Sequence, residues 1–223
     1  MNLTLFDLDG TLLPTDSDHA FGEFLVQIGW VDGEAHRRAN DRFYADYLAG
    51  RLDIAAYVDF ATAPWRRRSD AELAAVTARF LVEVVGPALH PTATALVQRH
   101  RDAGDLIAIV TATNEFVTRP IAALFAIDHL IATELARDAT GRVTGVIAGT
   151  PSFRDGKIAR VDAWLASLGH TMSDFDRCTF YSDSTNDLPL LEHVSHPVAT
   201  NPVPALAVIA AERGWPVLHL FKS

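Results

Sequence analysis

One stretch near the start of the chain, residues 3–13, constrains both the fold and the chemistry. It reads LTLFDLDGTLL, an apolar run that ends in Asp7, Asp9 and Gly10. Such a run predicts a buried strand that delivers polar groups at its carboxyl end. Because successive side chains of a strand alternate between faces, Asp7 and Asp9 project the same way. Two neighbouring carboxylates repel each other unless a cation lies between them or one takes a proton, so a divalent metal ion is the simplest explanation of the pair.

The composition bounds the class of protein. With 223 residues, 49% of them hydrophobic, the chain has room for one large domain or a core with a smaller insert. The single cysteine, Cys178, excludes an intramolecular disulfide and indicates a reducing compartment. A net charge of −9 argues against nucleic acid or an anionic membrane as a partner. No apolar run approaches the ~20 residues of a membrane span, so we expect a cytoplasmic protein of open oligomeric state.

Residues 14–87 differ from the flanking sequence because apolar residues recur there at helical spacing. The stretch predicts four helices, over residues 18–29, 32–49, 53–61 and 69–86, capped by Asp18, Asp32, Asp53 and a Ser69–Glu72 capping box. Glycine follows or ends most of these segments, as is typical of helix C-termini. We therefore expect an all-helical cap, residues 14–87, inserted into a core made of residues 1–13 and 88–223.

The rest of the chain alternates between strands and helices. Strands are predicted over residues 106–112, 129–135, 178–182, 198–200 and 216–220, helices over 91–103, 114–126, 157–168, 187–193 and 202–213, and a short β excursion over 141–149. The run LIAIVTA at 106–112 is typical of a parallel strand that is buried on both faces. The alternation predicts an α/β fold, a doubly wound, Rossmann-like parallel sheet with right-handed crossovers.

Polar residues follow several of these strands. Ligands of such sheets bind beyond the carboxyl ends of the strands. The first strand ends in Asp7 and Asp9, the second contains Thr111, and a later one runs into Asp183. Lys157 starts a helix, where the backbone dipole favours anions. A parallel sheet would bring all these groups to one edge, whereas scattered loop residues are the alternative.

Three carboxylates, one hydroxyl and one lysine suit phosphoryl transfer. Asp7, Asp183 and a backbone carbonyl offer Mg²⁺ the hard oxygen ligands it prefers. A carboxylate can then attack phosphorus to give an aspartyl phosphate. Thr111 would donate to a phosphoryl oxygen, and Lys157 would balance the charge of the transition state. Asp9 is placed to protonate the leaving alcohol and later to deprotonate water.

The order of these groups resembles the haloacid dehalogenase superfamily of phosphatases. The matching pieces are DLDGT at 7–11, IVTAT around Thr111, Lys157, and SDSTND at 182–187. The resemblance implies that Asp7 is the nucleophile, Asp9 the acid/base, Thr111 and Lys157 the phosphate grips, Asp7, Asp9 and Asp183 the metal site, and Gly10, Ala112, Asn186 and Asp187 the supporting and phosphate-binding residues. The helical insert resembles the cap of the subgroup that contains phosphoserine phosphatase. That enzyme has Ser-Gly-Gly where this chain has Thr111-Ala112-Thr113.

A closer resemblance is to bacterial phosphoserine-phosphatase-like hydrolases that carry DLDGTLL, DSD, RAN and FYADYLAGRLD, some of which act on histidinol phosphate. Asp16 falls where phosphoserine phosphatase has a glutamate that holds the substrate amine, which implies an amine-bearing phosphate ester. Phosphoserine would need a cation for its carboxylate, with Arg37, Arg38, Arg42 and Arg51 as candidates. Histidinol phosphate, the preferred hypothesis, would need a surface for imidazole, with Phe43, Tyr44, Tyr47 and Trp65 as candidates.

Other functions stay open on the sequence. A phosphotransferase or phosphomutase would pass the phosphoryl group of the same aspartyl phosphate to an alcohol or sugar instead of water. A binding protein without activity would keep the site for a phosphorylated ligand. The nine histidines lack the spacing of metal ligands and are interpreted as structural or surface residues.

Overall fold

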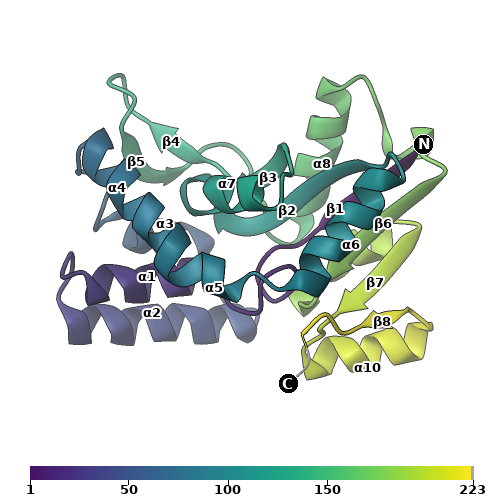
Figure 1. Cartoon of the computed structure of the whole chain (residues 1–223), viewed down its shortest axis with the longest axis horizontal. Helices are drawn as coiled ribbons and strands as arrows, with labels where there is room; N and C mark the ends of the chain where they lie inside the picture. The colour runs from purple at the N-terminus through teal and green to yellow at the C-terminus, as the bar shows by residue number, and fades with distance from the viewer. Residues whose placement is uncertain (222–223) are drawn as a thin grey trace.

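The computed structural model describes residues 1–221 and is built around a parallel sheet (Figure 1). Its strands are β1 (Asn2–Phe6), β2 (Leu106–Asn114), β3 (His129–Thr133), β6 (Arg177–Ser182), β7 (His196–Thr200) and β8 (Val217–Leu218). They lie in the order β3-β2-β1-β6-β7-β8, and every neighbouring pair is parallel. The prediction of a doubly wound parallel sheet is confirmed. Its carboxyl edge therefore collects the ends of β1, β2 and β6.

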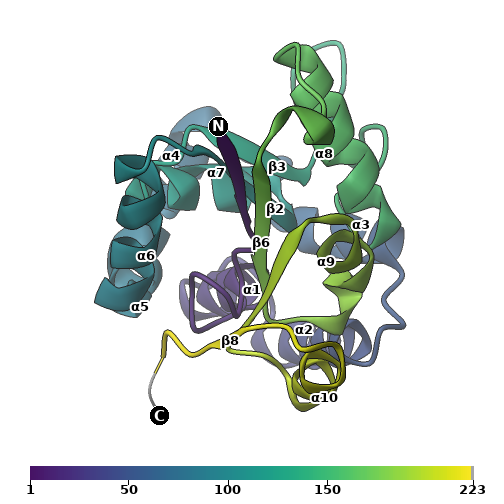
Figure 2. The ribbon, with the colours of Figure 1, turned by 90° about the vertical axis from the view of Figure 1, so that its right-hand side faces the viewer.

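Helices cover both faces of the sheet because its strands are apolar on both. Leu3 and Leu5 of β1 point to one face, in a cluster with side chains of α8 (Asp155–Ser167), α9 (Leu188–His193) and α10 (Pro204–Arg213). Phe6 points to the other face, in a cluster with side chains of α6 (Pro91–Asp102) and α7 (Glu115–Leu124). Figure 2 shows α6 on one side of the sheet and α8, α9 and α10 on the other.

The segment 14–87 is helical, as predicted. It forms α1 (Ser17–Gln27), α2 (Gly33–Leu48), α3 (Ile54–Thr62) and α4 (Asp70–Phe80), which Figure 1 shows grouped beside the sheet. Asp32, Asp53 and the Ser69–Glu72 capping box start their helices as expected. Buried side chains of this segment, among them Phe21 and Phe80, belong to the same apolar cluster as Phe6. The division into core and cap stays a prediction.

Two helix ends differ from the prediction. Asp16, and not Asp18, caps α1, because its Oδ1 accepts a hydrogen bond of 2.8 Å from the backbone nitrogen of His19, three residues on. The helix after Ser69 does not stop before Gly86 and Pro87. It continues as one wider turn over Leu81–Val85 and then as α5 (Gly86–Ala88). Proline is tolerated there because it lies in the first turn of α5, where its missing N–H costs least.

An antiparallel hairpin, β4 (Leu135–Arg137) with β5 (Val143–Ile147), follows β3 and confirms the predicted β excursion. The third strand ends at Thr133 and not at Leu135, because Leu135 pairs with Ile147 in the hairpin. The hairpin lies against α3. Gly145 has a φ of +91°, a left-handed backbone conformation that favours glycine.

Within residues 1–221, no single helix is long and apolar enough to cross a membrane. One pair, Asp70–Ala88 and Pro91–Asp102, meets the criteria of length and composition together, with a bend of 94° between its halves. Val76, Phe80 and Leu96 of this pair are buried inside the protein.

Trp65 packs the helical segment against the rest of the protein. It is 1% exposed, and its ring stacks on Phe116 of α7 at 4.0 Å. Trp65→Ala is expected to lower the free energy of unfolding by about 3–5 kcal/mol, measured by urea denaturation, because it opens a cavity. Val82→Ala, at a side chain that is 75% exposed, is the control and should change it by less than about 0.5 kcal/mol. Equal losses in the two variants would contradict this placement of Trp65.

Candidate active site

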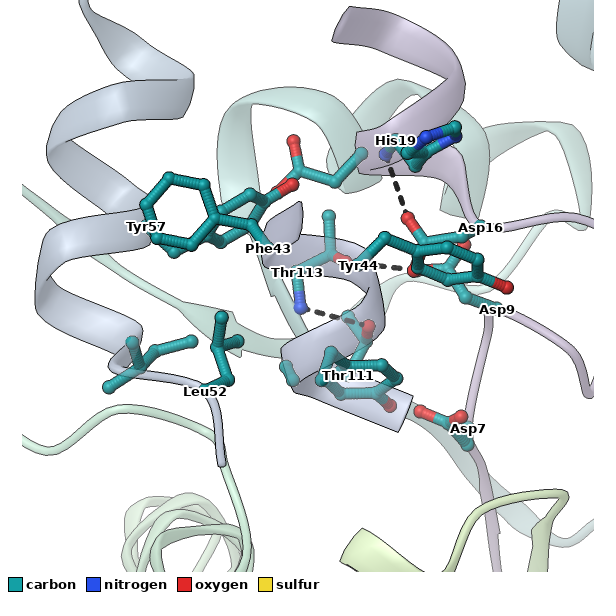
Figure 3. Close-up of a pocket in the computed structure, with 14 residues that line it drawn as sticks. Asp7, Asp9, Asp16, His19, Phe43, Tyr44, Leu52, Tyr57, Thr111 and Thr113 are labelled. Carbon is teal, nitrogen blue, oxygen red and sulfur yellow. Dashed lines mark hydrogen bonds between the residues drawn. The ribbon is translucent and has the colours of Figure 1, made fainter. Parts of the chain in front are cut away.

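A pocket opens at the carboxyl edge of the sheet (Figure 3). Asp7 and Asp9 reach it from the end of β1, and Thr111, Ala112 and Thr113 reach it from β2. The helical segment closes it with Asp16, Asp18 and His19, with Phe43, Tyr44 and Tyr47 of α2, and with Leu52, Ile54 and Tyr57. Figure 3 shows Asp7, Asp9 and Asp16 on one side and Phe43, Leu52 and Tyr57 on the other. The parallel sheet thus brings the predicted groups of two strands together.

Lys157 joins this edge from the first turn of α8. Its Nζ lies 2.9 Å from Oδ1 of Asp7 and 2.7 Å from Oδ1 of Asp187, and all three side chains are buried. Burial alone would lower the pKa of Lys157, but the charges of Asp187 and Asp7 outweigh it and raise that pKa to about 12. Burial raises the pKa of Asp7 to about 7, against the opposing charge of Lys157. The lysine therefore stays charged and holds the orientation of both carboxylates.

Asp9 is held at both of its carboxylate oxygens. Oδ1 accepts from the backbone nitrogen of Ser17 at 2.8 Å, and Oδ2 accepts from Oγ1 of Thr113 at 2.9 Å. Burial, with the charge of Asp16 added, raises the pKa of Asp9 to about 7. A carboxyl with this pKa can give and take a proton near neutral pH. Thr113 was expected at this edge together with Thr111, since residues two positions apart on a strand share a face, but its bond to Asp9 was not predicted.

The candidate metal ligands are hard oxygen donors that lie close to one another. Asp183 follows β6, and its Oδ1 accepts from Oγ1 of Thr11 at 3.0 Å. Burial, and then the charge of Asp7, raises the pKa of Asp183 well above its usual range. Gly10 has a φ of +74°, and a Cβ there would overlap the Asp183 carboxylate. The carbonyl of Asp9 adds a third oxygen, and this donor set fits a divalent cation.

Comparison with known proteins identifies the family. A model of the haloacid dehalogenase-like hydrolases matches residues 4–192. The chain belongs to this family. It is 46% identical over 218 residues, 98% of each chain, to a histidinol-phosphatase of Neisseria meningitidis. These matches confirm the resemblance predicted from the motifs and the prediction of a phosphatase.

Solved structures show the same fold. A protein of unknown function from Bordetella pertussis has 48% identity, a TM-score of 0.93 and 99% coverage of both chains. A substrate-bound phosphoserine phosphatase shares the fold, with a TM-score of 0.67 at 14% identity, over 97% of this chain and 91% of the other. The fold class predicted from sequence is therefore confirmed by comparison as well as by topology.

The helical segment of the hydrolase is tied to the catalytic edge at its α2–α3 loop. Nδ2 of Asn186 donates to the carbonyl of Tyr47 at 3.0 Å, and Arg154 donates to the carbonyl of Gly50. The amide nitrogen of Asn186 is thus bound to α2, and the expectation that Asn186 lies near the phosphate stays a prediction. The contact holds the aromatic side chains of α2 over the site.

The structure separates the candidates for substrate recognition. Phe43, Tyr44 and Tyr47 line the pocket, as does Asp16, whereas Trp65 is buried in the core. Among residues 1–221, no lysine or arginine lines the pocket. Of the four predicted arginines, Arg37, Arg38 and Arg51 pair with acidic side chains and Arg42 lies over Phe43. The expected arginine grip is therefore not found in the pocket. Arg37, Arg38 and Arg42 belong to α2 and lie on its surface, and Arg51 follows the helix and pairs with Asp46.

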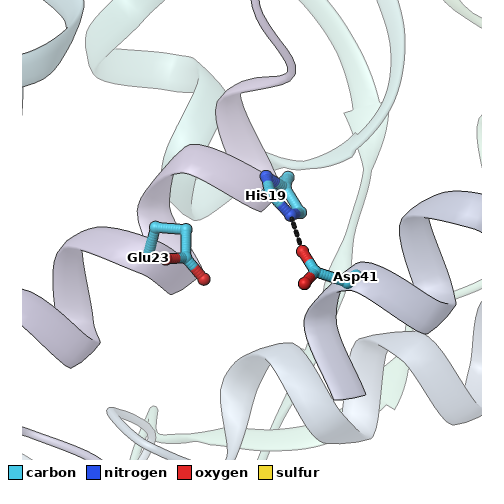
Figure 4. A group of neighbouring side chains, drawn as sticks. All are labelled: His19, Glu23 and Asp41. Carbon is cyan, nitrogen blue, oxygen red and sulfur yellow. Dashed lines mark hydrogen bonds and ion pairs between the residues drawn. The ribbon is translucent and has the colours of Figure 1, made fainter. Parts of the chain in front are cut away.

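A second group of potential metal ligands lies beside the pocket. His19 and Glu23, one turn apart on α1, lie near Asp41 of α2 (Figure 4), with ligand atoms within 4.8 Å of one another. His19 binds Asp41 at 2.8 Å, and Arg37 binds Glu23 at 3.0 Å. These ion pairs engage His19, Asp41 and one oxygen of Glu23, whereas Oε1 of Glu23 is buried without a hydrogen-bond partner. We assign the group no ligand. His19 also lines the pocket, which the interpretation of all histidines as structural or surface residues missed.

The buried ion pair of the hydrolase gives a prediction on stability. Lys157→Met is expected to lower the free energy of unfolding at pH 8 by about 3–5 kcal/mol, because it leaves Asp7 and Asp187 buried without a cation. Part of the loss should be recovered at pH 5, where Asp7, whose pKa is raised to about 7, takes a proton. The control is Arg79→Met, which breaks an exposed pair with Glu83 and should leave the free energy of unfolding nearly unchanged. Urea denaturation of both variants checks this, and similar losses would refute it.

Proposed function

We propose that this protein is a Mg²⁺-dependent phosphomonoester hydrolase that acts through an aspartyl phosphate on Asp7, with histidinol phosphate as its substrate. The observation that carries the proposal is one pocket that holds a lysine-bound carboxylate, a second carboxyl with a pKa of about 7 and two further aspartates, without a lysine or arginine in its lining from residues 1–221. The lysine-bound carboxylate and the second carboxyl suit phosphoryl transfer. The two further aspartates suit a leaving group that carries a positive charge.

In the first step, a carboxylate oxygen of Asp7 attacks phosphorus while the bond between phosphorus and the ester oxygen breaks. Asp9 gives its proton to the departing alcohol oxygen, which takes the electron pair of that bond. Lys157 offsets charge on the phosphoryl oxygens, and the Thr111 hydroxyl, at the pocket wall, donates to one of them. Asp7, Asp183 and the Asp9 carbonyl would hold Mg²⁺, which would mask the repulsion between the anionic ester and the anionic nucleophile.

In the second step, water attacks the phosphorus of the aspartyl phosphate. Asp9 takes a proton from this water, the bond between Asp7 and phosphorus breaks, and inorganic phosphate leaves. Ser17 and Thr113 hold the Asp9 carboxyl in place for both transfers through their bonds to its two oxygens.

The charges of the pocket favour an amino alcohol over an amino acid as the leaving group. Phosphoserine carries a carboxylate, which would lie among Asp9, Asp16 and Asp18 without a cation to balance it. Histidinol phosphate carries an amine and an imidazole and has no carboxylate. Asp16 is suited to bind the amine. Among the charged groups, Asp16 raises the pKa of Asp9 most, so it lies near Asp9 and the reacting ester. The histidinol-phosphatase of Neisseria meningitidis agrees with this substrate, and with a place in histidine synthesis.

Phosphate release from histidinol phosphate and from phosphoserine, measured side by side with Mg²⁺, tests the substrate. We expect kcat/KM for histidinol phosphate to be larger by about 100-fold or more, because of the missing cation for a carboxylate. Asp7→Asn serves as the blank and should release no phosphate. Free phosphate as the product also separates hydrolysis from transfer to another alcohol. A preference for phosphoserine would overturn the substrate, and full activity of Asp7→Asn would overturn the mechanism.

Asp9→Asn tests the second step with p-nitrophenyl phosphate, whose leaving group needs no proton. We expect a burst of about one nitrophenolate per enzyme, followed by turnover slowed about 10²–10⁴-fold, because water then lacks its base. Stopped-flow absorbance measures the burst. Histidinol phosphate, with an alcohol as its leaving group, should give no burst in this variant. A wild-type steady rate in Asp9→Asn would count against the role of Asp9.

A further inference from the structure

Asp18 is a buried carboxylate that the proposed mechanism does not use. It lines the pocket, yet only 6% of it is exposed. It does not cap α1, since Asp16 does so. A buried carboxylate costs folding free energy unless it is well paired, so its contacts decide what it is for.

The contacts of Asp18 leave it poorly satisfied. Nδ2 of Asn114 lies 3.3 Å from each of its oxygens, longer than an ordinary hydrogen bond to a carboxylate. Oδ1 of Asn114 is engaged elsewhere, where it accepts from the backbone nitrogens of Phe116 and Val117 at the start of α7. The hydroxyl of Tyr57 from α3 provides the other contact. Burial nevertheless raises the pKa of Asp18 to about 7, with the charge of Asp9 added.

The surroundings of Asp18 describe the missing partner. The nearby pocket walls are the flat rings of Phe43 and Tyr57 and the aliphatic side chain of Ile54. A flat ring that carries an N–H fits both the aromatic walls and the carboxylate. Phe43 and Tyr57 contact each other, with ring centroids 5.3 Å apart, so a substrate ring would stack on the side of them that faces the pocket. An aliphatic ammonium group would satisfy the carboxylate but could not stack on these rings.

We infer that Asp18 is a specificity-determining residue that accepts the ring N–H of a heteroaromatic group on the substrate, beside Tyr57 and Phe43. The inference rests on the proposed function and deepens it. Asp16 and Asp18 then divide the recognition, Asp16 binding the amine next to the phosphoester and Asp18 the imidazole beyond it. The site thereby selects esters that carry both groups and discriminates against simple amino alcohol phosphates.

The test compares two esters in the full-length protein with Mg²⁺. Histidinol phosphate carries the amine and the ring, and 2-aminoethyl phosphate carries the amine alone. For Asp18→Asn, which keeps the shape and removes the charge, we expect kcat/KM to fall about 30-fold for histidinol phosphate and to change less than about twofold for 2-aminoethyl phosphate. Asp59→Asn is the matched control, an exposed charge on α3 outside the pocket, and should leave both rates unchanged.

Two further readouts separate recognition from folding. Because the pKa of Asp18 is raised by burial, folding stability is lost as pH rises through about 7, so Asp18→Asn should melt no lower than wild type at pH 8. Tyr57→Phe, which removes only the hydroxyl beside Asp18, should lower kcat/KM for histidinol phosphate alone.

Equal losses on both esters in Asp18→Asn would make Asp18 a structural residue and overturn the inference. If wild type hydrolyses neither ester faster than Asp7→Asn, the proposed function fails on its own. Calorimetric binding of histidinol then decides the inference separately. Binding about 30-fold tighter to wild type than to Asp18→Asn supports it, and equal affinities refute it.

Discussion

Lys157 is a buried cation around which the carboxyl edge of the sheet is arranged. It bonds to Asp7 at the end of β1 and to Asp187 after β6, so it fixes two strands and the first turn of α8 in a single contact. Ser182 adds a bond of 2.7 Å to Asp187 and limits the freedom of that carboxylate. Without this pair, the sheet would bring together charges of one sign, and the repulsion would oppose the very topology that places them.

One lysine does not neutralise the whole edge. Asp9, Asp16, Asp18 and Asp183 remain, and burial raises the pKa of each. The folded protein thus holds negative charge at a cost in stability, which bound cations can offset by mass action. A metal ion near Asp183 and a cationic substrate near Asp16 are the two kinds of partner that the proposed function supplies. Stability and substrate choice are in this way consequences of the same charges.

The helical segment contributes the remainder of the site through a few polar contacts. The hydrogen bond from Asn186 to the carbonyl of Tyr47 holds the end of α2 at the carboxyl edge of the sheet, and with it the aromatic side chains of α2. The apolar cluster that includes Trp65 and Phe116 anchors the other end of the segment. A segment held firmly at one end and by main-chain hydrogen bonds at the other is suited to cover a reacting phosphate and exclude water.

The sequence by itself determined the sheet and the groups that meet at its edge, because strand periodicity and the parallel rule are local or topological properties. It predicted Asp7, Asp9, Thr111 and Lys157 at one site before any distance was known. Tertiary structure decided which side chains face the substrate. Asp16 and Asp18 lie two residues apart, and only the exact start of α1 determines that Asp16 caps the helix while Asp18 turns inward. Trp65 and the arginines of α2 were misplaced because helical periodicity does not say against which neighbour each face packs.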